Sequence, residues 1–257
     1  MNPTKQNIFI GGILILGPLL FSIYKSIEEK PIENCKSSVK SSVVLVIDRT
    51  GTLAETTVNS IEQIVDETIS LAEDFTTLSV YYIQKDSLST HPDFQTCIPP
   101  KKTTLTALTQ DEKKVQIAWD KFRDNFLKYL RKDMSVSPQS PIYGTVVDII
   151  RDKKTIKDPA QSKLIIFSDF IEYSPVADLH SGCLNASQIQ AKISQSLLFD
   201  PSDRPLSKIY VERFFIPRDG RSREYTECVK QTSDMVFNRM GMEAPTKFVY
   251  LSKSPKD

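Results

Sequence analysis

The sequence lacks the features by which nucleic-acid-binding and repeat proteins are recognised. Its 33 Lys and Arg residues are nearly balanced by 32 Asp and Glu residues, so the formal net charge is +1 and the pI is about 7.6. No basic block with interleaved aromatic residues is present, so we expect no nucleic-acid partner. The chain also contains no internal repeat and no low-complexity segment. These absences leave an ordinary globular domain as the expected form.

Long hydrophobic runs are absent except at the N-terminus. Ile8 to Tyr24 contains no charged residue and is flanked by Lys5 and Lys25. Its length is at the short limit for a membrane span. We therefore expect residues 1–25 to be an uncleaved, single-pass transmembrane anchor and residues 26–40 to be a polar linker.

Two other interpretations of this run remain open. A cleaved signal peptide is disfavoured because no small-x-small cleavage site follows the apolar residues. A buried globular helix is disfavoured by Gly11, Gly12 and Pro18 within the run. Basic residues flank the run on both sides, so their count does not set the orientation in the membrane.

Cysteine and histidine are scarce, and their spacing does not suit a zinc site. No CxxC pair occurs among the four cysteines, which are Cys35, Cys97, Cys183 and Cys228. An even number behind a membrane anchor fits one or two disulfides in an oxidising compartment. Four unpaired thiols in a cytosolic protein are the alternative. Four cysteines allow three pairings, and the sequence does not choose among them.

The rest of the chain is organised around one short apolar run and the polar turn that follows it. Val43 to Ile47 is apolar on both faces, as expected for a central strand of a parallel sheet. Asp48, Thr50 and Thr52 follow at once, and ligands of open α/β sheets bind where strands end. Such an all-oxygen cluster suits a hard cation such as Mg²⁺ or a phosphate bridged by one. Capping of the next helix is the simpler alternative.

Strand-like and helix-like segments alternate after this run. We expect further strands at 78–83, 163–167, 209–216 and 248–251, an irregular loop at 86–100, and helices at 54–75, 110–132, 141–151, 188–198 and 222–240. The helix at 54–75 has apolar positions near helical spacing, namely Val58, Ile61, Ile64, Val65, Ile69 and Leu71. This order predicts one doubly wound α/β domain over residues 41–257, with a mostly parallel sheet and helices on both faces.

Two further polar groups come at the ends of predicted elements. Ser140 followed by Pro141 is a helix-start signal, with Ser140 at the N-cap and Pro141 at the first helical position. Ser168 and Asp169 end the strand at 163–167, so a second carboxylate is expected at the same edge of the sheet as Asp48.

These three groups together resemble the von Willebrand factor type A domain. That family has an Asp-x-Ser/Thr-x-Ser/Thr turn after its first strand, a Thr or Ser opening a later helix, and an Asp after its fourth strand. Asp48, Thr50 and Thr52 resemble the first, Ser140 the second and Asp169 the third. The resemblance implies a metal-ion-dependent adhesion site for Mg²⁺ or Mn²⁺. Thr145 is a weaker candidate for the second group, and Phe170 stands where the family often has Gly.

A second family is similar over a shorter stretch. Asp48-Arg-Thr-Gly-Thr-Leu resembles the Asp-x-Asp-Gly-Thr-Leu of haloacid dehalogenase-like phosphotransferases, and more closely the Asp-Lys-Thr-Gly-Thr-Leu of P-type ATPases. In that interpretation Asp48 would be a nucleophile that forms an aspartyl phosphate. Thr50 replaces the carboxylate that would act as general acid and base.

We expect the first resemblance to describe the protein. It implies a non-catalytic binding module. Together with the expected anchor at residues 8–24 and the four cysteines, it leads us to expect a bacterial cell-envelope protein whose soluble domain is periplasmic or extracellular. Its cation would be held by Asp48, Thr50, Thr52, Ser140 and Asp169. Water and an acidic side chain of a protein partner would complete the coordination.

Overall fold

The structure is a computed structural model, and it describes residues 40–51, 53–83, 91–101, 112–131, 139–174, 178–180, 182, 206–217, 220–242 and 247–251. The strands are β1 (Ser42–Asp48), β2 (Thr77–Ile83), β3 (Phe94–Cys97), β4 (Ser162–Ser168), β5 (Tyr210–Phe215) and β6 (Lys247–Tyr250). The α-helices are α2 (Glu55–Leu71), α4 (Glu112–Leu130), α5 (Ile142–Arg151) and α7 (Arg223–Arg239), and two short 3-10 helices are η1 (Pro159–Gln161) and η3 (Leu206–Lys208).

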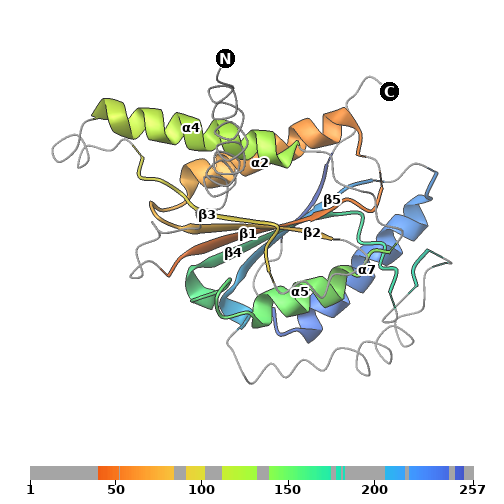
Figure 1. Ribbon diagram of the computed structural model, residues 1–257. Coiled ribbons are helices and arrows are strands. Elements are labelled where there is room, and N and C mark those ends of the chain that lie inside the picture. The colour runs from red at the N-terminus through yellow and green to blue at the C-terminus, as the bar shows by residue number, and fades with distance from the viewer. Residues whose placement is uncertain are drawn as a thin grey trace, which may run out of the picture. The chain divides into compact units, whose positions relative to one another are not determined.

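The six strands form one sheet in the order β3-β2-β1-β4-β5-β6. All neighbouring pairs are parallel except β2 and β3, which are antiparallel. Helices α2 and α4 lie over one face of the sheet, and α5 and α7 lie over the other (Figure 1). The predicted doubly wound α/β architecture is therefore confirmed for this part of the chain.

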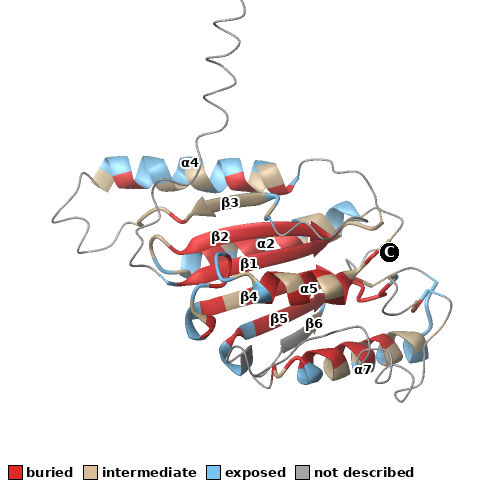
Figure 2. Cartoon of the chain, turned by 60° about the horizontal axis from the view of Figure 1, so that its bottom comes forward, coloured by how far each residue is buried: buried red, intermediate tan, exposed pale blue. Residues whose placement is uncertain are grey.

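The central strands are buried on both faces because each face has its own helices. Every residue of β1 and β2 is buried (Figure 2). Val43, Leu45 and Ile47 pack with the α2 and α4 residues, whereas Val44 and Val46 pack with the α5 and α7 residues. This alternation follows from the two-residue period of a strand. It explains why β1 has no polar residue between Ser42 and Asp48.

Helix α2 is shorter than predicted and buries only part of its predicted apolar stripe. Ile61, Val65 and Ile69 are buried, but Leu71 is 79% exposed. Residues two positions apart in a helix point about 200° apart around its axis. Because Ile69 faces the sheet, Leu71 faces away from it. The helix ends at Leu71 rather than at Phe75, which adopts a positive φ of 65° in the turn that leads into β2.

The segment predicted as an irregular loop at 86–100 contains the edge strand β3. Its four residues are all only partly buried, and they pair with Thr77–Val80 of β2. Asp93 fastens the start of β3 by accepting a hydrogen bond from the Tyr82 backbone N–H at 2.7 Å. A four-residue strand that exists through pairing with a neighbour has no periodicity that sequence analysis can detect.

Three other expectations fall partly or wholly outside the described residues. The predicted anchor at 8–24, nearly all of the linker at 26–40, and the helix expected at 188–198 lie there. Within the part of the chain that the structure describes, no helix is long and apolar enough to cross a membrane. Cys97 in β3 and Cys228 in α7 are both disulfide-bonded. The other two cysteines, Cys35 and Cys183, lie outside the described residues.

Two apolar residues of α4 test this packing. Phe126 is 1% exposed and Ile117 is 45% exposed. We expect Phe126→Ala to lower the free energy of unfolding by about 3–5 kcal/mol because it leaves a cavity in the core. Ile117→Ala should change it by less than about 0.5 kcal/mol. Equal effects of the two substitutions in urea unfolding would contradict the packing of α4 on the sheet.

Candidate functional site

The polar residues at the C-terminal ends of β1 and β4 lie at the point where the strand order reverses. From β1 the chain continues to β2 and β3 on one side of the sheet, and β4 continues to β5 and β6 on the other. The connections leaving β1 and β4 therefore diverge, which leaves room above the strand ends. In open α/β sheets, this crevice is where ligands bind.

The carboxylate of Asp48 is the centre of a hydrogen-bonded cluster at this point. Its Oδ1 accepts from the Thr50 backbone N–H at 2.9 Å and from Thr50 Oγ1 at 2.6 Å. Its Oδ2 accepts from Ser140 Oγ at 3.2 Å and from Ser168 Oγ at 2.7 Å. Asp48 is only 3% exposed. The structure thus brings together hydroxyl groups from three separate segments around one buried carboxylate.

Ser168 belongs to this cluster because of the register between β1 and β4. Ile47 of β1 pairs with Phe167 of β4, so the next residues of the two strands, Asp48 and Ser168, also lie beside each other. Side chains of residues that lie beside each other on neighbouring parallel strands point to the same face of the sheet. Asp169 comes one residue later, and its Oδ1 accepts from the Ile171 backbone N–H at 2.9 Å. Of the two residues that follow Phe167, the sequence led us to place Asp169, and not Ser168, in the site.

Ser140 is not the N-cap that its sequence context predicts. The cap position of α5 is Pro141, and the helix begins at Ile142. Glu172 takes over the capping role, because its Oε2 accepts from the Tyr143 backbone N–H in the first turn at 3.0 Å. A carboxylate at a helix N-terminus is favoured by the helix dipole. The hydroxyl of Ser140 is therefore available to Asp48.

Glu172 is a buried carboxyl group that sequence analysis did not assign to the site. It is fully buried, and no donor among the described residues reaches its Oε1. The pKa of Glu172 is raised to about 7, mainly by burial and in smaller part by the negative charge of Asp48, while the hydrogen bonds that Glu172 accepts act to lower it. No Lys or Arg of the described residues forms an ion pair with Asp48 or Glu172. Two buried carboxyl groups thus lie here with no ion-pair partner among the described residues.

The loop after β4 holds a strained residue at its second position. Phe170 is fully buried, and its φ of 54° lies in the left-handed region. Von Willebrand factor type A domains, which the sequence resembles, often have Gly at this position. Such a conformation costs a non-glycine residue about 1–2 kcal/mol. Its backbone N–H donates to Ser168 Oγ at 2.8 Å. That bond leaves the Ser168 hydrogen directed at Asp48.

The other residues singled out in the sequence have different positions. Thr52 lies outside the described residues. Thr145 donates its hydroxyl to the Pro141 carbonyl at 2.8 Å, within α5. Arg49 donates to the Leu130 carbonyl and lies over the Tyr82 ring at 4.4 Å, and so ties the loop after β1 to the end of α4.

Exposed aromatic residues and an arginine surround the loop after β4. The Tyr173 and His180 rings meet edge to face at 5.3 Å, and both residues are exposed. Arg221 is exposed and lies over the Tyr225 ring at 4.6 Å. Tyr225 Oη donates to the Leu179 carbonyl at 2.5 Å, which joins the start of α7 to this loop. Tyrosine and arginine are the residue types most enriched where proteins bind one another.

Comparison with known proteins adds little to this geometry. No protein-family model and no curated protein matches the sequence. Among solved structures, a von Willebrand factor type A protein from Catenulispora acidiphila matches with a TM-score of 0.35 and 11% identity. The match covers 79% of this chain and 43% of that one, so the chain spans less than half the length of the matched structure. The fold assignment therefore depends on the strand order and helix placement described above.

The raised pKa of Glu172 predicts a specific loss of stability with rising pH. An unfolded glutamate ionises near pH 4.5, whereas the folded protein holds this proton until about pH 7. Between these values only the folded state binds the proton, so stability falls as pH rises, by about 3 kcal/mol in total. We expect Glu172→Gln to remove this fall in urea unfolding with EDTA from pH 4.5 to 8. The exposed control Glu67→Gln should retain it, and an unchanged pH profile in Glu172→Gln would disprove the assignment.

Proposed function

We propose that this chain is a divalent-cation-dependent protein-binding module of the von Willebrand type A kind, held at a membrane by its N-terminal segment, and that it is not an enzyme. One observation carries the proposal. The Asp48 carboxylate gathers hydroxyl groups from the loop after β1, the segment before α5 and the end of β4. A helix cap requires one such oxygen and not three.

The donor set fits Mg²⁺ or Mn²⁺. A hydroxyl has one hydrogen and two lone pairs, so Thr50, Ser140 and Ser168 each retain a lone pair for a cation after donating to Asp48. Their distances to the Asp48 oxygens, 2.6–3.2 Å, are compatible with the roughly 3 Å between adjacent oxygens around an octahedral Mg²⁺. No group of three or more His, Cys, Asp and Glu among the described residues suits a metal. Hydroxyl groups would therefore supply much of this coordination.

Such a site favours a partner that brings its own negative charge. Asp48 and Asp169 would supply negative charge to the cation, directly or through water, and Thr50, Ser140, Ser168 and Thr52 would supply hydroxyl ligands. Neutral hydroxyl groups leave part of the cation's charge uncompensated. An acidic side chain of a partner would complete the coordination, and Arg221 offers a second contact for acidic groups. Tyr173 and His180 would supply apolar contact area beside it.

The membrane and compartment parts of the proposal have separate support. The uncharged run at 8–24 is the basis for the anchor. The disulfide-bonded state of Cys97 and Cys228 favours an oxidising compartment, and so a periplasmic or extracellular position for the domain.

The phosphotransferase alternative has less support from the same geometry. A nucleophilic carboxylate needs an oxygen that can approach phosphorus in line. Asp48 is 3% exposed, and both of its oxygens accept two hydrogen bonds.

The cation site is tested by thermal unfolding of the full chain with EDTA, Mg²⁺ or Mn²⁺. At a cation concentration of 100 times Kd, binding stabilises the folded state by about 2.7 kcal/mol, which raises Tm by roughly 5–10 °C. We expect Asp48→Asn to abolish this rise. The control Asp66→Asn removes a surface carboxylate that pairs with Arg123 at 2.5 Å, and it should retain the rise.

Two outcomes would contradict the proposal. The first is a Tm that does not respond to either cation, or that responds equally in Asp48→Asn. The second is hydrolysis of p-nitrophenyl phosphate that requires Asp48, which would assign the site to phosphoryl transfer instead.

A further inference from the structure

The edge of the sheet opposite Asp48, where the parallel strands begin, is rich in exposed basic side chains. We call this the entry edge. Its exposed basic residues are Lys40, Arg151, Lys153, Lys154, Lys157, Lys208 and Arg239. They come from the segment before β1, the end of α5 and the loop before β4, the end of η3 before β5, and the end of α7.

These segments are neighbours in space because the strands that they precede are neighbours. The order β1-β4-β5 places the beginnings of these three strands side by side. The 3-10 helices η1 and η3, which precede β4 and β5, contact one another. Lys157 Nζ lies 3.5 Å from Thr77 Oγ1 at the start of β2. The basic residues therefore share one end of the domain.

Acidic residues at the entry edge are mostly committed to local bonds. Asp74, Asp152 and Asp158 are half-buried, and each accepts a hydrogen bond from a backbone N–H. Glu212 pairs with Lys163 at 2.9 Å, and Asp148 is half-buried with Arg151 close to it. Glu73 is exposed. Among these six acidic residues only Glu73 is exposed, against seven exposed basic residues, so the exposed charge of the described entry edge is mainly positive.

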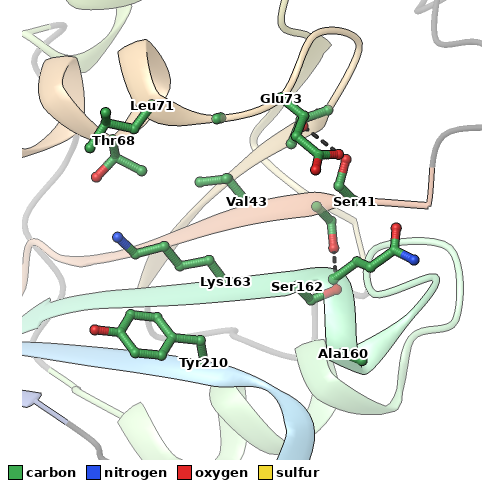
Figure 3. Close-up of a pocket in the computed structure, with 13 residues that line it drawn as sticks. Ser41, Val43, Thr68, Leu71, Glu73, Ala160, Ser162, Lys163 and Tyr210 are labelled. Atoms are coloured by element: carbon green, nitrogen blue, oxygen red, sulfur yellow. Dashed lines mark hydrogen bonds between the residues drawn. The ribbon is translucent and has the colours of Figure 1, made fainter.

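A cavity of about 420 Å³ opens at the same edge, between the end of α2 and the beginnings of β1, β4 and β5 (Figure 3). Leu71, 79% exposed, and Tyr210, 40% exposed, are among the residues that line it. The hydroxyl groups nearby already bond to one another, Ser42 to Ser162 at 2.7 Å and Ser41 to Thr76 at 2.9 Å. The cavity thus places Leu71 and Tyr210 at the same edge as the exposed basic residues, and its lining also includes Lys163 and the exposed Glu73.

The chain that precedes the described residues also arrives at this edge. Lys40 is the first described residue and lies directly before β1. The predicted membrane span ends at Tyr24, so the fifteen residues between them can reach at most about 50 Å. The expected anchor is therefore connected to the domain at the entry edge.

We propose that the entry edge binds an anionic lipid surface, with its basic side chains on the lipid headgroups and Leu71 and Tyr210 in the interfacial layer. Clustered Lys and Arg residues near a membrane span are attracted to anionic lipids, and exposed apolar side chains add to that attraction. The site around Asp48, at the other end of the strands, then faces away from the membrane. The inference goes beyond the proposed function and does not depend on the cation site.

The experiment measures lysine labelling on the full chain reconstituted, in EDTA, into vesicles of phosphatidylcholine alone or with about a third phosphatidylglycerol. A membrane-impermeant acetylating reagent is used, and each lysine is read by mass spectrometry. We expect Lys153, Lys154, Lys157 and Lys208 to react about threefold more slowly in the anionic vesicles, with recovery at roughly 0.5 M salt. Lys121 and Lys128 on α4 should react equally in both.

Two double variants with the same net charge distinguish an effect of the entry-edge lysines from an effect of the protein's overall charge. Lys153→Glu with Lys154→Glu, and Lys121→Glu with Lys128→Glu, both change the formal net charge from +1 to −3, a difference of four. The first pair of substitutions should abolish the difference in labelling rate between the two kinds of vesicle at Lys157 and Lys208. The second pair should preserve that difference. Equal labelling in both lipids, or loss of protection in both variants, would overturn the proposal. Protection that appears only after a membrane-protein extract is added would also overturn it, in favour of a protein partner.

Discussion

The arrangement of the site depends on one buried carboxylate and the hydroxyl groups bonded to it. Asp48 ends β1, one of the two central strands of the sheet, and is 3% exposed. A charged group in such a place is tolerated only when its oxygens are satisfied. Four donors supply these hydrogen bonds, and they come from segments about 120 residues apart at the extremes. The carboxylate thus holds together three loops that the sheet alone would leave independent.

The capping of α5 by Glu172 follows from the same requirement. Had Ser140 capped the helix, its hydroxyl would have been directed at a backbone N–H rather than at Asp48. Glu172 caps the helix instead, and its burial beside Asp48 raises its pKa to about 7. The strained φ of Phe170 belongs to the turn that brings Glu172 back to α5. Strain and a costly buried carboxyl group both occur at the candidate site, a pattern frequent at functional sites.

The two ends of the parallel strands differ in charge and in chemistry. The ends that carry Asp48, Asp169 and Glu172 concentrate buried oxygen atoms, whereas the opposite end carries exposed lysines and an apolar cavity rim. A parallel sheet produces such a separation naturally, because all loops that leave strands lie at one edge and all loops that enter them lie at the other. The formal net charge of +1 is a total over the whole chain and does not report how charge is distributed between the two ends.

The sequence by itself determined the α/β class, the approximate place of the five parallel strands, and the grouping of Asp48, Thr50 and Ser140 at one edge of the sheet. Continuous apolar runs followed at once by polar turns are local signals, and they need no knowledge of the partner strand. The edge strand β3, the role of Ser168, the capping by Glu172 and the exposure of Leu71 were decided by the tertiary structure. Each of these depends on strand register, on pairing or on the rotation of a helix against the sheet. A shift of one residue in register would move Ser168 away from Asp48, and no local sequence pattern specifies that register.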